Sequence, residues 1–183
     1  MTNKPDFHNL LLTLMAFLAI SVSLASAPAA GGLAARKTES SHKSAIYRGA
    51  WFDVRYPAGF TARPSIKSST TEGYDSAEFI SSDGTVSFYV FAPQWGGEAS
   101  DIALVPESEE LVSEQRRQAR DREIHWFTIA ARDGSYRRSY QETVARQGSV
   151  KTVVGIRYQS EEARLNYQKA YELFRNSLKL YAD

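Results

Sequence analysis

The chain has 183 residues, with 22 Lys and Arg against 21 Asp and Glu and a formal net charge of +1. A balance this even provides no overall attraction to nucleic acid or anionic lipid, so we expect no nucleic-acid partner. The chain has no Cys, which excludes disulfides and thiolate metal sites.

Residues 1–27 have the order of a secretory signal peptide. Lys4 gives a weakly positive start, residues 10–24 form an apolar run, and small residues follow. We predict cleavage after residue 27, or as late as residue 30, and export to the bacterial periplasm. The alternative is an uncleaved inner-membrane anchor facing the periplasm, because no charge lies between Leu10 and Ala35. Only this alternative involves the membrane.

Residues 28–44 are small, polar and charged and are typical of a flexible lead-in. Residues 45–183 suit one domain. In "WFDVRY" (51–56), Phe52, Val54 and Tyr56 alternate with other residues, which predicts a strand ended by a Pro–Ala–Gly turn.

Two Asp-Gly pairs, at 83–84 and 133–134, each stand between apolar runs and predict hairpins. The first turn sets Phe79 opposite Phe88. In the strand that follows it, "TVSFYVFA" (85–92), both faces are apolar, so we expect it to be central and covered on both sides.

Two helices are predicted. Residues 107–120, "ESEELVSEQRRQAR", place Glu near the positive end of a helix and Arg near its negative end. Their Arg-rich end favours a solvated helix face. Residues 161–177 follow Ser160, the expected N-cap, and a third strand is expected at 151–158. Six apolar residues fall on one face of the terminal helix, and charges fill the other: Ala163, Tyr167, Ala170, Tyr171, Phe174 and Leu178.

The fold class predicted from these elements is α+β. Antiparallel hairpins form a sheet, and a strand buried on both faces calls for cover on both. We therefore expect an antiparallel β-sheet flanked by helices on both faces, as an α/β/α sandwich.

The order of four segments resembles the PsbP-like superfamily, which includes the extrinsic photosystem II subunit, bacterial DcrB-type envelope proteins and a Ran-binding import factor. The four are similar to the family's opening strand and Pro turn, its central strand, its second hairpin and its closing element: "FDVRYPAGF" (52–60), "VSFYVFA" (86–92), "IHWFTIAARDGSYRRSYQETVA" (124–145) and "NSLKL" (176–180). The resemblance implies an antiparallel sheet flanked by helices and a binding or assembly role. It implies no catalytic residue.

Catalytic and metal-binding patterns are sparse. Counting across the second Asp-Gly turn places His125 opposite Glu142. This pair is either a cross-strand contact or the base and orienting carboxylate of a hydrolase. We expect no metal, because one domain His without Cys is no zinc ligand set, and no cofactor, because nucleotide-binding glycine motifs are absent.

The long connection "APQWGGEASDIAL" (92–104) is the candidate binding segment, with Trp95, Gly96 and Gly97 as its candidate partner- or ligand-binding residues. Long loops often carry function, and Trp suits a binding hot spot. Alternatively, Trp95 covers one end of the sheet.

The leading hypothesis is an exported, non-catalytic binding or assembly factor of the cell envelope with a protein partner there. The alternatives are an envelope hydrolase using His125 and Glu142, and a domain tethered by an uncleaved N-terminal anchor.

Overall fold

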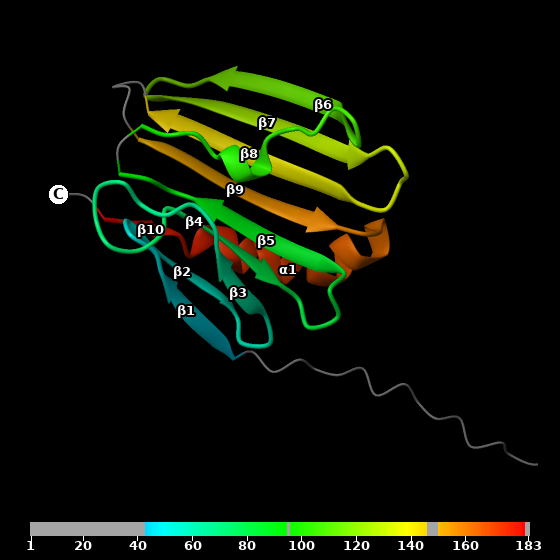
Figure 1. Cartoon of the computed structure of the whole chain (residues 1–183), viewed down its shortest axis with the longest axis horizontal. Coiled ribbons are helices and arrows are strands. Elements are labelled where there is room, and N and C mark those ends of the chain that lie inside the picture. The colour runs from blue at the N-terminus through cyan, green and yellow to red at the C-terminus, as the bar shows by residue number, and fades with distance from the viewer. Residues whose placement is uncertain (1–42, 95, 146–149, 182–183) are drawn as a thin grey trace, which may run out of the picture. The chain divides into compact units, whose positions relative to one another are not determined.

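Seven of the described strands form one antiparallel sheet in the order β3-β4-β5-β9-β8-β7-β6 (Figure 1). The computed structural model describes residues 43–94, 96–145 and 150–181. The sheet consists of β3 (Thr61–Pro64), β4 (Ser76–Ile80), β5 (Val86–Phe91), β6 (Glu109–Gln118), β7 (Arg122–Ala131), β8 (Arg137–Ala145) and β9 (Lys151–Tyr158).

The predicted signal peptide, its anchor alternative, nearly all of the predicted lead-in and Trp95 lie outside the described residues. Each of these stays a prediction.

A smaller sheet has the order β1-β2-β10, with β1 at Ser44–Arg48, β2 at Phe52–Pro57 and β10 at Lys179–Leu180. The predicted strand at 51–56 is thus confirmed as β2, with Phe52 and Val54 buried. Strand β1 was not expected from the sequence. It pairs antiparallel with β2 along its whole length.

Both hairpins form about their Asp-Gly turns. Gly84 and Gly134 have φ of 70° and 74°, values that glycine adopts without steric cost. The registers match the predictions, with Phe79 opposite Phe88 and His125 opposite Glu142. Strand β9 has the predicted bounds.

The terminal helix α1 spans Glu161–Asn176 and begins as predicted, because the Ser160 side chain accepts a hydrogen bond from the Ala163 amide at 3.1 Å. Its apolar stripe packs on a core that includes Phe52, Phe79 and Phe88. Phe174 is 1% exposed and contacts both Phe79 and Phe88, with ring centroids 5.2 Å apart in each case.

The two faces of the large sheet are covered differently. On one, the helix face, lie α1 and the small sheet (Figure 1). On the other, the strap face, lies the strap, which we define as residues 96–108 with the short 3-10 helix η1 (Ser100–Ile102). Strand β5 is buried throughout, so the predicted cover on both faces is confirmed.

The prediction of helices on both faces is wrong. Among the described residues one α-helix is present, and it lies on the helix face. The buried cluster under the strap is small: Tyr89, Phe91, Ile102, Tyr140 and Val153. A strap with Ile102 and Ala99 covers this area without a full helix.

The predicted helix at 107–120 is also wrong, because residues 109–118 form β6. Helix propensity is a weak preference that tertiary pairing overrides, and β6 pairs along almost its full length with β7. Only Glu109 of β6 is buried, so the segment has no apolar stripe for a helix to bury. An exposed, charged strand with a bulge between Leu111 and Ser113 suits a sheet edge.

Candidate functional site

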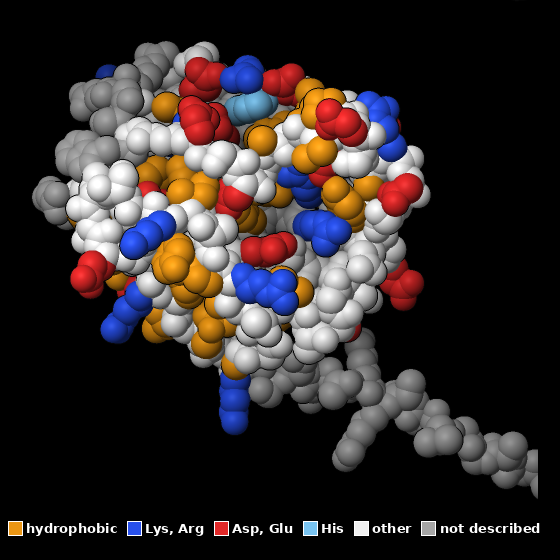
Figure 2. Space-filling view, viewed as in Figure 1, with side chains coloured by type: hydrophobic (Ala, Val, Ile, Leu, Met, Phe, Trp, Pro, Cys, Tyr) orange, Lys and Arg blue, Asp and Glu red, His pale blue; other side chains and the backbone are white. Residues whose placement is uncertain are grey.

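His125 lies on the strap face of β7, but its imidazole contacts a carboxylate other than the predicted one. Its Nε2 is 2.8 Å from Glu114 Oε1 on the edge strand β6. Phe127 packs against the ring at a centroid distance of 4.9 Å. Figure 2 shows acidic and basic side chains gathered at the upper edge of this face.

Glu142, the predicted partner of His125, lies 3.9 Å from Lys151 Nζ. That ammonium donates to both carboxylate oxygens of Glu98 at 2.9 Å. The register across β7 and β8 is therefore confirmed, while the side-chain pair on which the hydrolase hypothesis depends is not formed. His125 contacts Glu114 instead because strand β6 brings Glu114 beside it. The sequence had predicted a helix for this segment.

Arg138 and Glu109 form a buried ion pair that fastens the strap to the sheet. Arg138 Nε donates to Glu109 Oε1 at 2.8 Å, and the side chains are 8% and 3% exposed. The guanidinium also donates to the carbonyls of Ile102 at 2.6 Å and Ala103 at 3.0 Å. Both the guanidinium and the carboxylate are therefore engaged in contacts that hold the strap on the sheet.

The electrostatics of Glu109 reflect this role. Burial alone would raise the pKa of its carboxyl, but hydrogen bonds from Arg138, Tyr136 and the Val105 amide outweigh burial and lower the pKa to about 2. Glu109 is therefore ionised at neutral pH and is unsuited to act as a general acid or base there.

Asp101 fastens η1 in a similar way. Tyr89 donates to its Oδ1 at 2.6 Å, and Ser65 and Ser76 contact Oδ2 at 2.5 and 3.2 Å. Burial, together with the neighbouring carboxylate, raises the pKa of Tyr89. The phenol stays protonated and keeps its hydrogen bond to Asp101.

Of the candidate binding residues, Gly96 and Gly97 lie within the described residues and Trp95 does not. Gly96 is exposed, and a Cβ added there would meet nothing within 4 Å. Gly97 is exposed too and lies over Phe91, whose Cζ would be 3.4 Å from such a Cβ. The prediction that this segment binds a partner stays a prediction.

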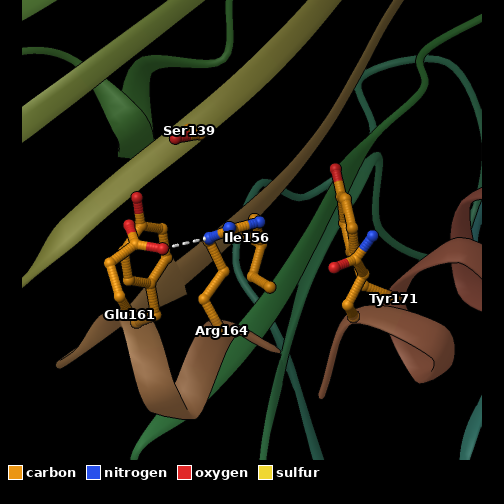
Figure 3. A pocket seen from close by; sticks show the side chains of 7 residues that line it. Ser139, Ile156, Glu161, Arg164 and Tyr171 are labelled. Atoms are coloured by element: carbon orange, nitrogen blue, oxygen red, sulfur yellow. Dashed lines mark hydrogen bonds and ion pairs between the residues drawn. The ribbon is translucent and has the colours of Figure 1, made fainter. Parts of the chain in front are cut away.

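A small pocket of about 360 Å³ lies between the start of α1 and strands β8 and β9 (Figure 3). Within it Arg164 Nε donates to Glu161 Oε2 at 2.6 Å, so the two charges satisfy each other. Burial raises the pKa of Tyr171 to about 12, so this phenol is no base at neutral pH. The pocket offers no unpaired charge for a ligand.

A larger groove, of about 710 Å³, runs between α1, from Asn166 onward, and the end of β2. Aromatic rings held by the core line its floor. Phe60 packs against Phe88 and Tyr167 at centroid distances of 5.0 and 5.6 Å, and Tyr56 packs against Phe79 at 4.7 Å. These rings already have fixed positions before anything binds.

Four cationic side chains line the same groove: Lys43, Arg55, Lys169 and Lys179. All four are exposed, no Asp or Glu lines the groove with them, and none forms an ion pair within the part of the chain that the structure describes. We call these four side chains the cationic rim.

Some cations elsewhere on the described surface form ion pairs, and others do not. Arg116 contacts Glu114 and Glu123, Arg132 contacts Glu110, and Arg164 contacts Glu161. The groove thus brings four unpaired cations together with no acidic side chain in its lining, next to the exposed apolar side chain of Leu173.

Among the described residues, no group of three or more His, Asp or Glu side chains could hold a metal ion. No helix in the described ranges is long and apolar enough to cross a membrane.

The groove was missed by sequence reasoning because it joins residues far apart in the chain, from Lys43 to Lys179. One signal was present in the terminal helix. Leu173 falls outside the predicted apolar stripe, and at 63% exposure it is a large apolar side chain left in solvent. The groove is the candidate functional site.

The described residues define an α+β protein built mainly from antiparallel strands. No protein-family model matches the sequence, and no curated protein matches it. Solved structures similar to it include PsbP (CyanoP) from Synechocystis sp. PCC 6803, with 11% identity and a TM-score of 0.45, covering 75% of this chain and 92% of that chain.

The Ran-binding protein Mog1p from Saccharomyces cerevisiae is also similar, with 11% identity and a TM-score of 0.39, covering 75% of this chain and 94% of that one. Both kinds of protein are among those that the sequence resemblance named. The likeness concerns fold and assigns no role to any residue.

Proposed function

We propose that this chain is an exported, non-catalytic binding or assembly factor of the cell envelope, and that it holds a protein partner in the groove between α1 and β2. One observation carries the proposal: an apolar floor with fixed rings lies beside a cationic rim without ion-pair partners among the described residues. Covering the floor provides affinity, and the rim provides orientation and specificity.

The size of the groove agrees with this role. Its volume of about 710 Å³ lies within the range of roughly 300–1,000 Å³ that is usual for ligand sites. The groove lining holds four cations and no Asp or Glu, so carboxylates of a partner could pair with these cations without competition from within the groove.

Export is proposed from residues 1–27, whose apolar run and small residues are typical of a signal peptide. The proposed location is the bacterial periplasm, reached either by cleavage near residues 27–30 or with the segment retained as an inner-membrane anchor.

Site-specific photocrosslinking tests the function. A benzophenone amino acid is placed at Leu173 in the groove or at Leu165, which is 58% exposed on the same helix and does not line the groove. We expect one defined protein adduct in the envelope from position 173 and none from position 165. The purified partner should re-form the adduct, and Lys169→Glu should weaken it.

Equal adducts from both positions, or none from position 173, would contradict the proposed site. Hydrolysis of an ester or peptide from a broad panel that is lost in His125→Ala would overturn the non-catalytic claim.

A further inference from the structure

The length of the groove limits what it holds. Its α1 residues run from Asn166 to Asn176, which is about 15 Å at the helical rise of about 1.5 Å per residue. An extended peptide covers this length with about five residues at roughly 3.3 Å each. The groove therefore suits a short segment and not a whole folded surface.

The cationic rim is distributed around the groove. Lys43 precedes β1, Arg55 is on β2, Lys169 is on α1 and Lys179 is on β10. A ligand with one anionic head group contacts only part of such a rim. Several carboxylates spaced along a chain match it better, since each cation then gains a partner.

Neutral polar groups on the groove wall favour a peptide further. Asn166 and Asn176 line the groove, are exposed, and form no side-chain hydrogen bond with another described residue. A carboxamide both donates and accepts, so these two side chains are available to the backbone amides of a peptide. The acyl chain of a lipid has no group for them.

We propose that the occupant is a short acidic segment of a partner protein, in which carboxylates alternate with large apolar side chains. This inference rests on the proposed function and adds the chemistry of the partner. In an extended segment alternate residues face opposite sides, so apolar side chains reach the aromatic floor and the exposed Leu173, while carboxylates lie near the cationic rim.

Fluorescence anisotropy of dye-labelled peptides with the full chain tests the inference. The probe is a short peptide that alternates Glu with Leu and Phe. One control peptide replaces each Glu with Lys, and another replaces each Leu and Phe with Ser. We expect the probe to bind and both controls to bind at least about tenfold more weakly, which is about 1.4 kcal/mol.

Matched protein variants locate the binding. Arg55→Glu combined with Lys169→Glu should weaken the probe at least about tenfold, whereas Arg117→Glu, an exposed cation on β6, should leave it unchanged. Raising NaCl from about 0.1 M to about 1 M shortens the screening length from about 10 Å to about 3 Å, and should weaken the probe further. Thermal unfolding of each variant verifies that it is folded.

Three results would overturn the inference: binding of the Lys peptide as tight as that of the probe, binding that survives the Arg55 and Lys169 reversal, or displacement of the probe by palmitate at lower concentration than by unlabelled peptide. The last result would assign the groove to an anionic lipid chain. If the crosslinking from position 173 succeeds while the probe fails, the proposed function stands and only this partner chemistry is wrong.

Discussion

Arg138 connects the strap to the sheet through one buried guanidinium. The guanidinium carbon of Arg138 lies over the Tyr140 ring, 5.7 Å from its centroid. Its ion-pair partner could not be predicted, because Glu109 was assigned to a helix. The pairing depends on a strand register that brings together residues 29 positions apart.

The Glu109 carboxylate makes the free energy of unfolding depend on pH in the acidic range. Its pKa is about 2 in the folded chain against 4.5 for the free side chain, so its contribution is complete above pH 4.5 and is lost as the pH falls towards 2. The shift corresponds to on the order of 3 kcal/mol at neutral pH. Glu109→Gln should lower the free energy of unfolding by about 3–5 kcal/mol at pH 7.

Urea unfolding between pH 7 and pH 2 measures this effect. The gap between wild type and Glu109→Gln should narrow as the pH falls below 4.5, whereas Glu110→Gln, which removes an exposed pair, should cost less than about 1 kcal/mol. Parallel pH curves for wild type and Glu109→Gln would show that the carboxylate is not held as described.

Gly155 has no room for a side chain because the Tyr140 ring on the neighbouring strand lies against it. A Cβ at this position would lie 2.1 Å from Tyr140 Cδ1 and 3.0 Å from the Ser139 carbonyl oxygen. Gly155→Ala should therefore lower the free energy of unfolding by about 1–3 kcal/mol through overpacking. Gly96→Ala, where a Cβ meets nothing within 4 Å, is the matched control and should differ little. An unchanged unfolding midpoint for Gly155→Ala would contradict this packing.

At the scale of elements, the terminal helix depends on its N-cap. Ser160 satisfies the Ala163 amide, and Ser160→Ala should cost about 1 kcal/mol. Ser113→Ala on the exposed edge strand should stay within about 0.5 kcal/mol. Denaturant unfolding of the two variants tests this prediction. Equal unfolding midpoints for Ser160→Ala and Ser113→Ala would contradict the role of Ser160 as N-cap.

Local patterns predicted most of the strands and the terminal helix because their determinants lie within a few residues. Asp-Gly turns set the hairpin registers, and the spacing from Ala163 to Leu178 set the buried face of α1. The edge strand β6 was misread because its Glu and Arg residues favour a helix when considered alone. Its pairing with β7 and the cover provided by the strap are long-range effects, which no local pattern contains.

At the scale of the whole molecule, a net charge of +1 conceals an uneven distribution. The predicted candidate residues Trp95, Gly96 and Gly97 drew attention to the connection after β5, whereas the groove lies between α1 and β2. It is assembled only when β1, β2, α1 and β10 come together, which is why the sequence alone did not reveal it.

The affinity of the crosslinked partner for two matched variants tests the central claim most directly. Leu173→Glu places a charge inside the groove, and Leu165→Glu places the same charge elsewhere on the same helix. Isothermal titration with the purified partner should give a Kd at least about tenfold weaker for Leu173→Glu and an unchanged Kd for Leu165→Glu. Equal affinities for both variants would show that the groove between α1 and β2 is not the binding site.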